Sequence, residues 1–382
     1  MKRFLCLLTA ALLMAMLLPS AVMAAGPEVA AKSAVLMDLT TGTVLAEQNA
    51  HEKLAPASVT KVMTMLLIME AIDSGKIHWD DTVIASEAAA AKGGSQVYLK
   101  VGESMSVTDM VKSIAVSSAN DCACAMAEHI AGSEEAFVEQ MNRRAKELGM
   151  DDTHFVNCTG LDDSPEAAEH RTSAYDIALM SRELMVNHPD IQKFTTIWMD
   201  TIRDGVFGLA NTNKMIRFYP GATGLKTGFT AGAGYCLSAT AQREQLGLVA
   251  VVMGAETSQE RFAASKQLMD YGFANYALVS PEAPGGTVRV KLGEAETVEA
   301  VPSEPVQLLV DKGQAGQVTV ETTLDEEVAA PVSKGQRLGT LTVKVGNQTI
   351  KQVPLVASEG VSRLSWWDIF LRVLGKVAMA RE

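Results

Sequence analysis

The chain has 382 residues, of which 48% are hydrophobic and 20% are charged, and its formal net charge is −12. This length is enough for two domains with a large core, and the composition is that of an ordinary globular protein. The acidic balance argues against a general nucleic-acid-binding protein, because such a protein needs a basic surface to displace counterions from phosphates.

The first residues, MKRFLCLLTAALLMAMLLPSAVMA, combine a basic start, an apolar middle and small residues near the end. This pattern predicts a secretory signal peptide over residues 1–24, cut after Ala24 or Ala25, and a mature chain that works outside the cytoplasm. A retained transmembrane anchor is the alternative. Removal of the two positive charges of Lys2 and Arg3 would change the net charge from −12 to −14.

Four cysteines follow the predicted signal peptide, too few for a disulfide framework in a chain of this length. They are Cys122, Cys124, Cys158 and Cys236. Cys122 and Cys124 are two residues apart on an expected helix, where they point to nearly opposite sides and cannot easily pair with each other. An exported chain can form disulfides, but buried free thiols are the preferred interpretation.

The first predicted domain, residues 25–279, begins with a hairpin over residues 33–48, where two apolar-rich strands flank Thr-Gly. Helical patterns dominate from about 56 to about 196. Residues 221–254 then read as strands, and a last helix closes the domain near residue 278.

The composition changes at SPEAPGG, residues 280–286, which indicates a linker. Short alternating segments with no helical pattern follow it, and they predict a small all-β domain over residues 283–357. This domain contains no cysteine or histidine and no evident catalytic cluster. Its expected role is therefore spacing or presentation.

Residues 361–382 predict an amphipathic helix in which Asp368, Arg372 and Lys376 form one polar stripe. The opposite arc is apolar and consists of Leu364, Trp367, Phe370, Leu371, Leu374, Val377 and Ala378. Charges interrupt this segment too often for a membrane-spanning helix. A basic amphipathic helix with tryptophans is typical of the lipid interface. The alternative is a helix that packs on its own protein or on a second copy.

The first candidate for chemistry is the pair Ser58 and Lys61, at the head of the apolar run KLAPASVTKVMTMLLIMEAI. At this spacing on a helix the two side chains share a face, and burial disfavours the charged form of a lysine. A neutral amine beside a hydroxyl is a general base beside a nucleophile. The motif alone is weak, since a surface N-cap serine with a solvent-reaching lysine has the same spacing.

Two further short motifs strengthen this interpretation. SSAND places Ser118 and Asn120 in a helical region, although both are poor helix-interior residues, so a local break would present them to a cleft. GLKTGFT places Lys226, Thr227 and Gly228 on an expected strand, where a cation and a hydroxyl suit a carboxylate and the glycine admits another backbone. A simple turn and an ordinary hairpin strand are the respective alternatives.

The three motifs, in this order, form the set S-x-x-K, S-x-N and K-T-G. On ASVTK, SSAND and LKTGFTAGAGYCLSATA, the chain resembles the low-molecular-weight penicillin-binding proteins that are D-alanyl-D-alanine carboxypeptidases, over about residues 30–278. The resemblance extends to the β-domain and the amphipathic tail. The family usually has glycine where this chain has Ala119, a small departure that is not expected to abolish activity.

The resemblance implies an α/β (α+β) fold of the β-lactamase/transpeptidase-like type, with an antiparallel sheet flanked by helices and a helical lobe beside it. It also implies an acyl-enzyme reaction without metal or cofactor. Ser58 would attack the carbonyl between two D-alanines of a peptidoglycan stem peptide, and Lys61 would take its proton. Ser118 would relay a proton to the leaving amine, and water would then hydrolyse the acyl-enzyme. β-Lactam antibiotics would be covalent inhibitors.

The same resemblance implies which residues bind the substrate. Asn120 would hold the peptide, and Lys226 and Thr227 would receive its terminal carboxylate. The oxyanion hole would use the backbone N–H of the nucleophile and that of Phe229, which follows Gly228 in the third motif. The implied place of work is the outer face of the cytoplasmic membrane or the cell wall space, with the C-terminal helix on the membrane surface.

Other chemistries fit the sequence less well. The six histidines show no metal-ligand spacing and there is no Gly-x-Ser-x-Gly elbow, which argues against a zinc carboxypeptidase or an α/β-hydrolase. A class A-like β-lactamase would share the three motifs but would need a deacylating glutamate in an E-x-x-L-N-like loop, which is not found. A catalytically silent wall-binding protein would be expected to have lost Ser58 or Lys61. The sequence does not separate a D,D-carboxypeptidase from a D,D-endopeptidase.

Overall fold

The structure is a computed structural model that describes residues 26–371. The chain divides into two compact units, Met1–Phe273 and Ala274–Glu382. The predicted signal peptide lies outside the described residues. The first unit carries all three sequence motifs singled out above, so its layers position the candidate site.

A five-stranded antiparallel sheet in the order β2-β1-β9-β8-β7 forms the centre of the first unit. Its strands are β1 (Ser33–Asp38), β2 (Val44–Gln48), β7 (Ala222–Thr230), β8 (Gly234–Arg243) and β9 (Leu246–Ala255). Every residue of β9 is buried, because this apolar strand lies in the middle of a sheet that is covered on both faces. The structure confirms the predicted hairpin over 33–48 and the predicted strands over 221–254.

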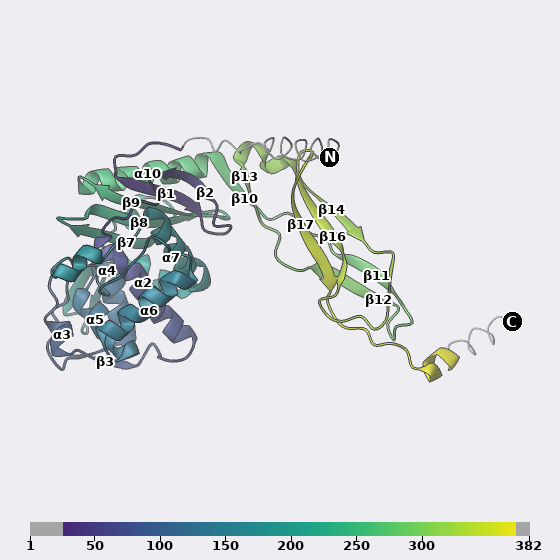
Figure 1. Cartoon of the computed structure of the whole chain (residues 1–382), viewed down its shortest axis with the longest axis horizontal. Helices are drawn as coiled ribbons and strands as arrows, with labels where there is room; N and C mark the ends of the chain where they lie inside the picture. Colours follow the sequence, from purple (N-terminus) through teal and green to yellow (C-terminus); the bar gives the residue numbers. More distant parts are fainter. Residues whose placement is uncertain (1–25, 372–382) are drawn as a thin grey trace, which may run out of the picture. The chain divides into compact units, whose positions relative to one another are not determined.

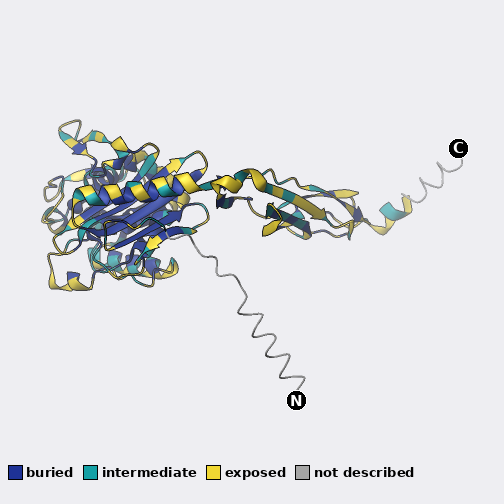
Figure 2. Ribbon diagram, turned by 90° about the horizontal axis from the view of Figure 1, so that it is seen from above, coloured by how far each residue is buried: buried dark blue, intermediate teal, exposed yellow. Residues whose placement is uncertain are grey.

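Helices lie on both faces of this sheet (Figure 1). One long helix, α10, crosses one face and turns its exposed residues outward (Figure 2). The other helices gather on the opposite side and form the helical lobe. From residue 26 onward, the helices of the unit are α2 (Lys61–Asp73), α3 (Glu87–Ala90), α4 (Val107–Ser117), α5 (Asn120–Ala131), α6 (Glu134–Glu147), α7 (Ala174–Asn187), α8 (Gln192–Thr195), α9 (Met215–Phe218) and α10 (Ser258–Asn275).

Short elements connect these layers. The 3-10 turns are η1 (Ala57–Thr60), η2 (Pro165–Glu169) and η3 (Pro189–Ile191). Two small hairpins pair β3 (Thr82–Ile84) with β4 (Ser104–Ser106) and β5 (Met199–Ile202) with β6 (Phe207–Ala210). Helix α2 is apolar on nearly all sides and is therefore buried in the core rather than amphipathic. Its first residue is Lys61, so the lysine enters the interior with the helix.

The prediction that the last helix of this unit reaches residue 278 is wrong at its end. Helix α10 stops at Asn275, and Tyr276–Val279 forms strand β10, which pairs antiparallel with β13 (Leu308–Asp311). The local pattern of YALV suits a helix as well as a strand. Its partner lies some thirty residues further along the chain, so local periodicity could not decide between them.

The second unit is a β-unit with its own core of valine and leucine side chains. Its six-stranded sheet has the order β14-β16-β17-β12-β11-β15. The strands are β11 (Gly286–Lys291), β12 (Thr297–Pro302), β14 (Val318–Leu324), β15 (Glu327–Ala329), β16 (Arg337–Val345) and β17 (Gln348–Ala357), with one 3-10 turn, η4 (Lys312–Gln317). A helix-flanked antiparallel sheet followed by an all-β unit is the predicted fold class.

The C-terminal helix begins at residue 366, not at 361 as predicted. Val361 and Arg363 instead form bridges to Val332 and Gly293 of the β-unit. Among residues 26–371, no helix is both long enough and apolar enough to cross a membrane. The remaining members of the predicted stripe and arc lie outside the described residues; they are Arg372, Leu374, Lys376, Val377 and Ala378.

Candidate active site

Ser58 lies in the turn η1, directly before α2, and is half-buried. Lys61 is fully buried, and its Nζ lies 2.9 Å from the Oγ of Ser58 and 2.8 Å from the carbonyl oxygen of Thr159. One amine proton is therefore committed to Thr159. The lone pair of a neutral Lys61 then remains for the proton of the serine hydroxyl, which is the geometry that a general base needs.

Burial sets the charge of Lys61. Desolvation lowers the pKa of its amine to about 7, while the nearby Cys158 and Asp121 act in the opposite direction. Near neutral pH a large fraction of this lysine is thus unprotonated. A base whose pKa lies close to the working pH is the most effective one, because it is both available and strong enough.

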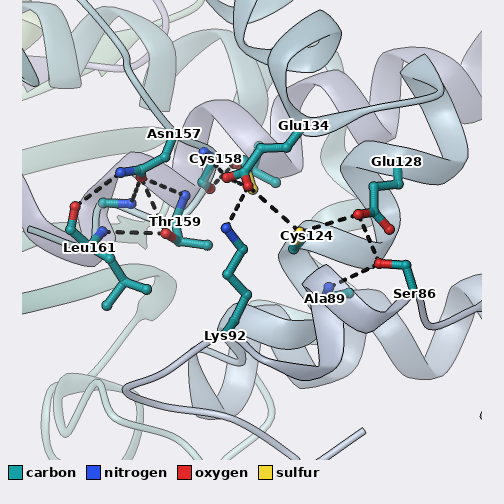
Figure 3. A network of polar contacts seen from close by, with 12 residues as sticks. Ser86, Ala89, Lys92, Cys124, Glu128, Glu134, Asn157, Cys158, Thr159 and Leu161 are labelled. Atoms are coloured by element: carbon teal, nitrogen blue, oxygen red, sulfur yellow. Dashed lines mark hydrogen bonds and ion pairs between the residues drawn. The ribbon is translucent and has the colours of Figure 1, made fainter. Parts of the chain in front are cut away.

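The turn that supplies the Thr159 carbonyl is itself held by polar contacts (Figure 3). The backbone N–H of Cys158 and the amine of Lys92 both donate to the carboxylate of Glu134, at 3.1 and 2.5 Å. Burial opposes ionisation of Glu134, yet these hydrogen bonds keep its pKa below the ordinary value. The side chain of Asn157 closes the turn by accepting from the N–H of Gly160 at 2.6 Å. The hydrogen-bond acceptor of Lys61 is therefore fixed in place.

The second motif forms the predicted break in the helical region. Helix α4 ends at Ser117, Ser118 takes a left-handed conformation with φ 65°, and α5 starts at Asn120. The Nδ2 of Asn120 donates to the carbonyl of Gly93 at 2.7 Å. In the part of the chain that the structure describes, the Oγ of Ser118 and the Oδ1 of Asn120 are buried without a protein partner. Buried polar atoms of this kind are costly unless water or a ligand satisfies them.

The third motif is on β7. Lys226 is buried and its Nζ donates to the carbonyl of Thr227 at 2.9 Å. Desolvation holds the pKa of Lys226 well below its ordinary value, and the neighbouring charges of Lys61 and Arg261 act in the same direction. Arg261 reaches from α10 and donates to the carbonyl of Gly228 at 2.9 Å. An anionic group beside Lys226 would remove much of this electrostatic cost.

Strand β7 packs closely against the turn that carries Ser58. A Cβ atom on Gly228 would lie 2.7 Å from the carbonyl oxygen of Pro56 and 3.1 Å from the backbone nitrogen of Ser58. Contacts this short exclude a side chain at this position. The sequence interpretation of Gly228 as a point of close backbone approach agrees with this geometry.

A residue outside the three motifs connects the second of them to the third. The N–H of Thr212 donates to the carbonyl of Val116 in α4, at 3.1 Å, and its Oγ1 lies 2.6 Å from the Oγ1 of Thr227. Helix α2 also packs against α4 and α5. The structure thus brings together the elements that carry Ser58, Ser118 and Lys226, as the family resemblance implies.

Comparisons with known proteins identify the first unit. The family model for D-alanyl-D-alanine carboxypeptidase matches residues 20–257, and the model for the C-terminal domain of penicillin-binding protein 5 matches residues 273–363. The D-alanyl-D-alanine carboxypeptidase DacF of Bacillus subtilis is 44% identical over 90% of this chain and 89% of its own.

The chain belongs to the D-alanyl-D-alanine carboxypeptidase family. Penicillin-binding protein 5 of Haemophilus influenzae has a similar structure, with a TM-score of 0.76 and 30% identity over 89% of this chain and all of its own. Penicillin-binding protein D2 of Listeria monocytogenes in an ampicillin-bound form matches 65% of this chain and all of its own, with a TM-score of 0.60 and 31% identity. The enzyme is a serine-type carboxypeptidase, and its reaction is the hydrolysis of the bond between two D-alanines.

Several residues that shape this carboxypeptidase site had no signal in the sequence. Thr159, Thr212 and Arg261 lie in none of the three motifs, and they act through backbone carbonyl or hydroxyl contacts. Nothing in the sequence around Thr159 indicates that its backbone carbonyl would bind Lys61. The predicted buried free thiols are confirmed, because all four described cysteines are buried and unpaired.

One cluster among residues 26–371 has the residue types of a metal site, namely Glu70, Glu183 and His188. Arg144 already donates to both glutamates, at 2.7 and 2.6 Å. An arginine held between two carboxylates neutralises the charge that a cation would need. This cluster is better explained as a surface ion-pair network, and it gives the carboxypeptidase no further chemistry.

Proposed function

We propose that Ser58 is the acylated nucleophile and Lys61 its general base. The observation that supports this assignment is the 2.9 Å separation of the two side-chain atoms, with a lysine that burial brings to a pKa of about 7. Attack on the carbonyl of the penultimate D-alanine forms a tetrahedral intermediate while the Ser58 proton passes to Lys61. Ser118 relays a proton to the departing D-alanine, and water then hydrolyses the acyl-enzyme.

The proposed binding roles are based on the buried polar atoms that have no protein partner and on the residues of strand β7. Asn120 has a free carbonyl oxygen for a peptide N–H, and Lys226 with Thr227 receives the terminal carboxylate. The N–H groups of the nucleophile and of Phe229 stabilise the oxyanion, and one such donor typically contributes about 3 kcal/mol. We further propose that the first unit, for which the sequence predicts residues 25–279, is the catalytic domain and that the β-unit, for which it predicts residues 283–357, is a spacer domain.

The reaction distinguishes this proposal from its alternatives. The purified enzyme should release D-alanine from a stem pentapeptide that ends in D-Ala-D-Ala. A D,D-endopeptidase would instead cleave a cross-linked dimer of stem peptides faster than the pentapeptide, and a β-lactamase would turn over penicillin rapidly. A related protein is known in an ampicillin-bound form, so labelled penicillin should give a slowly hydrolysed adduct whose peptide maps to Ser58. Mapping of the adduct to another residue would contradict the proposed mechanism.

Replacement of Lys226 by alanine is expected to reduce kcat/KM on the free pentapeptide by about 10²-fold, since a charge-assisted hydrogen bond to a carboxylate is lost. On the same peptide with a C-terminal amide, the loss should be small, because no carboxylate is present to be bound. The ratio of the two kcat/KM values measures the effect. Equal losses on both peptides would show that Lys226 does not bind the carboxylate.

We also propose that residues 1–24 direct export and that the C-terminal helix holds the enzyme on the membrane surface. Supporting this, Trp366, Trp367 and Leu371 are each more than 60% exposed in the described part of the helix. The side chain of Ser365 and that of Asp368 cap its first turn reciprocally, which favours a helix start at this point. Tryptophans exposed on a short helix are typical of a lipid interface.

Deletion of residues 365–382 from the mature enzyme should abolish binding to anionic vesicles and leave cleavage of soluble pentapeptide unchanged. The cut lies after Leu364, whose N–H still donates to the β-unit, so that unit keeps its bridges. Each large apolar side chain that enters lipid contributes about 1.5–3 kcal/mol, so loss of several removes reversible binding. A pelleting assay measures this. Failure of the uncut mature enzyme to pellet would make the helix a packing element.

A further inference from the structure

The residue before Ser58 has an unfavourable backbone conformation. Ala57 has φ 48°, in the left-handed region that residues with a Cβ rarely adopt, and it is buried. Such a conformation persists only where neighbouring groups hold it. The carbonyl oxygen of Ala57 has close neighbours of this kind. It accepts a hydrogen bond from the Oγ1 of Thr60 at 2.9 Å, and it lies so near Gly160 that a Cβ there would be 1.8 Å away.

The hydroxyl of Thr60 is in turn bound by a histidine from a distant segment. The Nε2 of His170 lies 2.9 Å from the Oγ1 of Thr60, and its Nδ1 lies 3.1 Å from the backbone nitrogen of Val156. Thr60 and His170 are both buried. These contacts form one chain from Val156 through His170 and Thr60 to Ala57, directly beside the nucleophile.

The direction of every hydrogen bond in this series follows from the first one, which the backbone N–H of Val156 donates. The N–H of Val156 can only donate, so the Nδ1 of His170 accepts and the proton of the neutral imidazole is on Nε2. The Nε2–H then donates to Thr60, whose own proton is directed to the carbonyl of Ala57. Reversal at any position would leave two donors or two acceptors facing each other.

The charges that face His170 support a neutral ring. Desolvation by burial lowers the pKa of its imidazole to about 4, and electrostatic interactions with His154 and Arg171 act in the same direction. The apolar ring of Phe155 lies edge-on to the imidazole, with the two ring centroids 5.6 Å apart. The imidazole is therefore neutral at any pH at which a lysine of pKa near 7 acts as a base.

We propose that His170 is a positioning residue for the nucleophile. Through the hydroxyl of Thr60 it holds the left-handed turn at Ala57, and that turn presents the Oγ of Ser58 to the Nζ of Lys61. This inference rests on the proposed role of Ser58. Neither His170 nor Thr60 touches the reacting atoms, so both act on the acylation rate and not on substrate binding.

Two pairs of variants, each with a matched control, test this series of hydrogen bonds. The glutamine of His170→Gln can accept from Val156 and donate to Thr60, whereas the leucine of His170→Leu can do neither. Thr60→Ser keeps the bridging hydroxyl, whereas Thr60→Val removes it at constant shape. The rate constant of acylation by labelled penicillin, and kcat and KM on the pentapeptide, are measured for each variant that unfolds cooperatively.

His170→Leu and Thr60→Val should each slow acylation by about 10- to 100-fold, because a small misplacement of a nucleophile has effects of this size. KM should stay within about threefold, and His170→Gln and Thr60→Ser should stay near the wild-type rate. The double variant that combines His170→Leu with Thr60→Val should be no slower than the slower of the two single variants, since both substitutions break the same series of hydrogen bonds. In ¹⁵N spectra of the wild-type enzyme, His170 should show the neutral form with its proton on Nε2.

Wild-type acylation rates in His170→Leu and Thr60→Val would overturn the inference, and so would losses that appear only in KM. If His170→Leu does not fold, the comparison of Thr60→Val with Thr60→Ser is sufficient to test the inference. Failure of the present inference and failure of the proposed function are distinguishable. An adduct mapped to Ser58 with unchanged rates in these variants refutes only the positioning role, whereas an adduct mapped elsewhere in the wild-type enzyme refutes the mechanism on which it rests.

Discussion

Ser58→Ala is expected to eliminate the release of D-alanine and the covalent penicillin adduct together. The variant keeps the turn, the buried Lys61 and the acceptor at Thr159, but it has no hydroxyl 2.9 Å from the amine. Removal of the nucleophile from a unit of this kind typically lowers kcat by roughly 10⁴-fold or more. Mass spectrometry of the penicillin-treated protein, with D-alanine release assayed in parallel, measures both effects.

A matched control for this experiment is Ser117→Ala. Ser117 directly precedes Ser118, and its hydroxyl donates to the carbonyl of Ser113 within α4, at 3.0 Å. Its loss should leave acylation within about threefold of the wild-type rate, because this hydroxyl serves the helix end. A penicillin adduct that persists in Ser58→Ala would place the nucleophile elsewhere and contradict the proposed mechanism.

The second large effect is expected for Lys61→Met. Methionine fills the same buried space without a base, so the proton of Ser58 has no acceptor in the transition state. A general base contributes typically 10²- to 10⁴-fold, and the acylation rate should fall by an amount in that range. Stopped-flow labelling with a fluorescent penicillin measures the rate. The thermal unfolding midpoint should change little, because the gain from replacing a buried amine by an apolar group is opposed by the loss of the hydrogen bond to Thr159.

The pH dependence of the acylation rate of the wild-type enzyme also tests whether Lys61 is the base. The base form of Lys61 is present above its pKa of about 7 and is lost as the pH falls through that value. Below it, the acylation rate should fall about tenfold per pH unit. Lys61→Arg keeps a positive charge but cannot be deprotonated, so it should be as slow as Lys61→Met at every pH. Activity in Lys61→Arg would make the residue an electrostatic group and not a base.

Residue types and spacing were sufficient to predict the three motifs of the site. Ser58 and Lys61 had to share a helical face, and Ser118 with Asn120 had to interrupt a helix, because these are local consequences of backbone geometry. Lys226 on a strand followed from the same kind of argument. The assembly of the motifs in one cleft was not local, and it was expected from the family resemblance alone.

The contacts that hold the site could not be predicted in this way. Thr159 binds Lys61 through a backbone carbonyl, which every residue has, so its identity carries no signal. His170 is 110 residues from Thr60, and its role depends on which ring nitrogen meets which neighbour. The pattern of residues 276–279 predicts the end of a helix where the structure has strand β10 for a related reason, since the partner of this strand is far along the chain.

Burial makes the end of a peptide and its interior electrostatically different for this site. Desolvation and the neighbouring cations disfavour a charge on Lys226. In the proposed complex, a terminal carboxylate beside this amine supplies the opposite charge and offsets much of that cost. The interior of a peptide has no such carboxylate, so the cost of a charge on Lys226 remains. The distinction between the end of a peptide and its middle then depends on the electrostatics of one buried lysine as well as on the fit of the peptide.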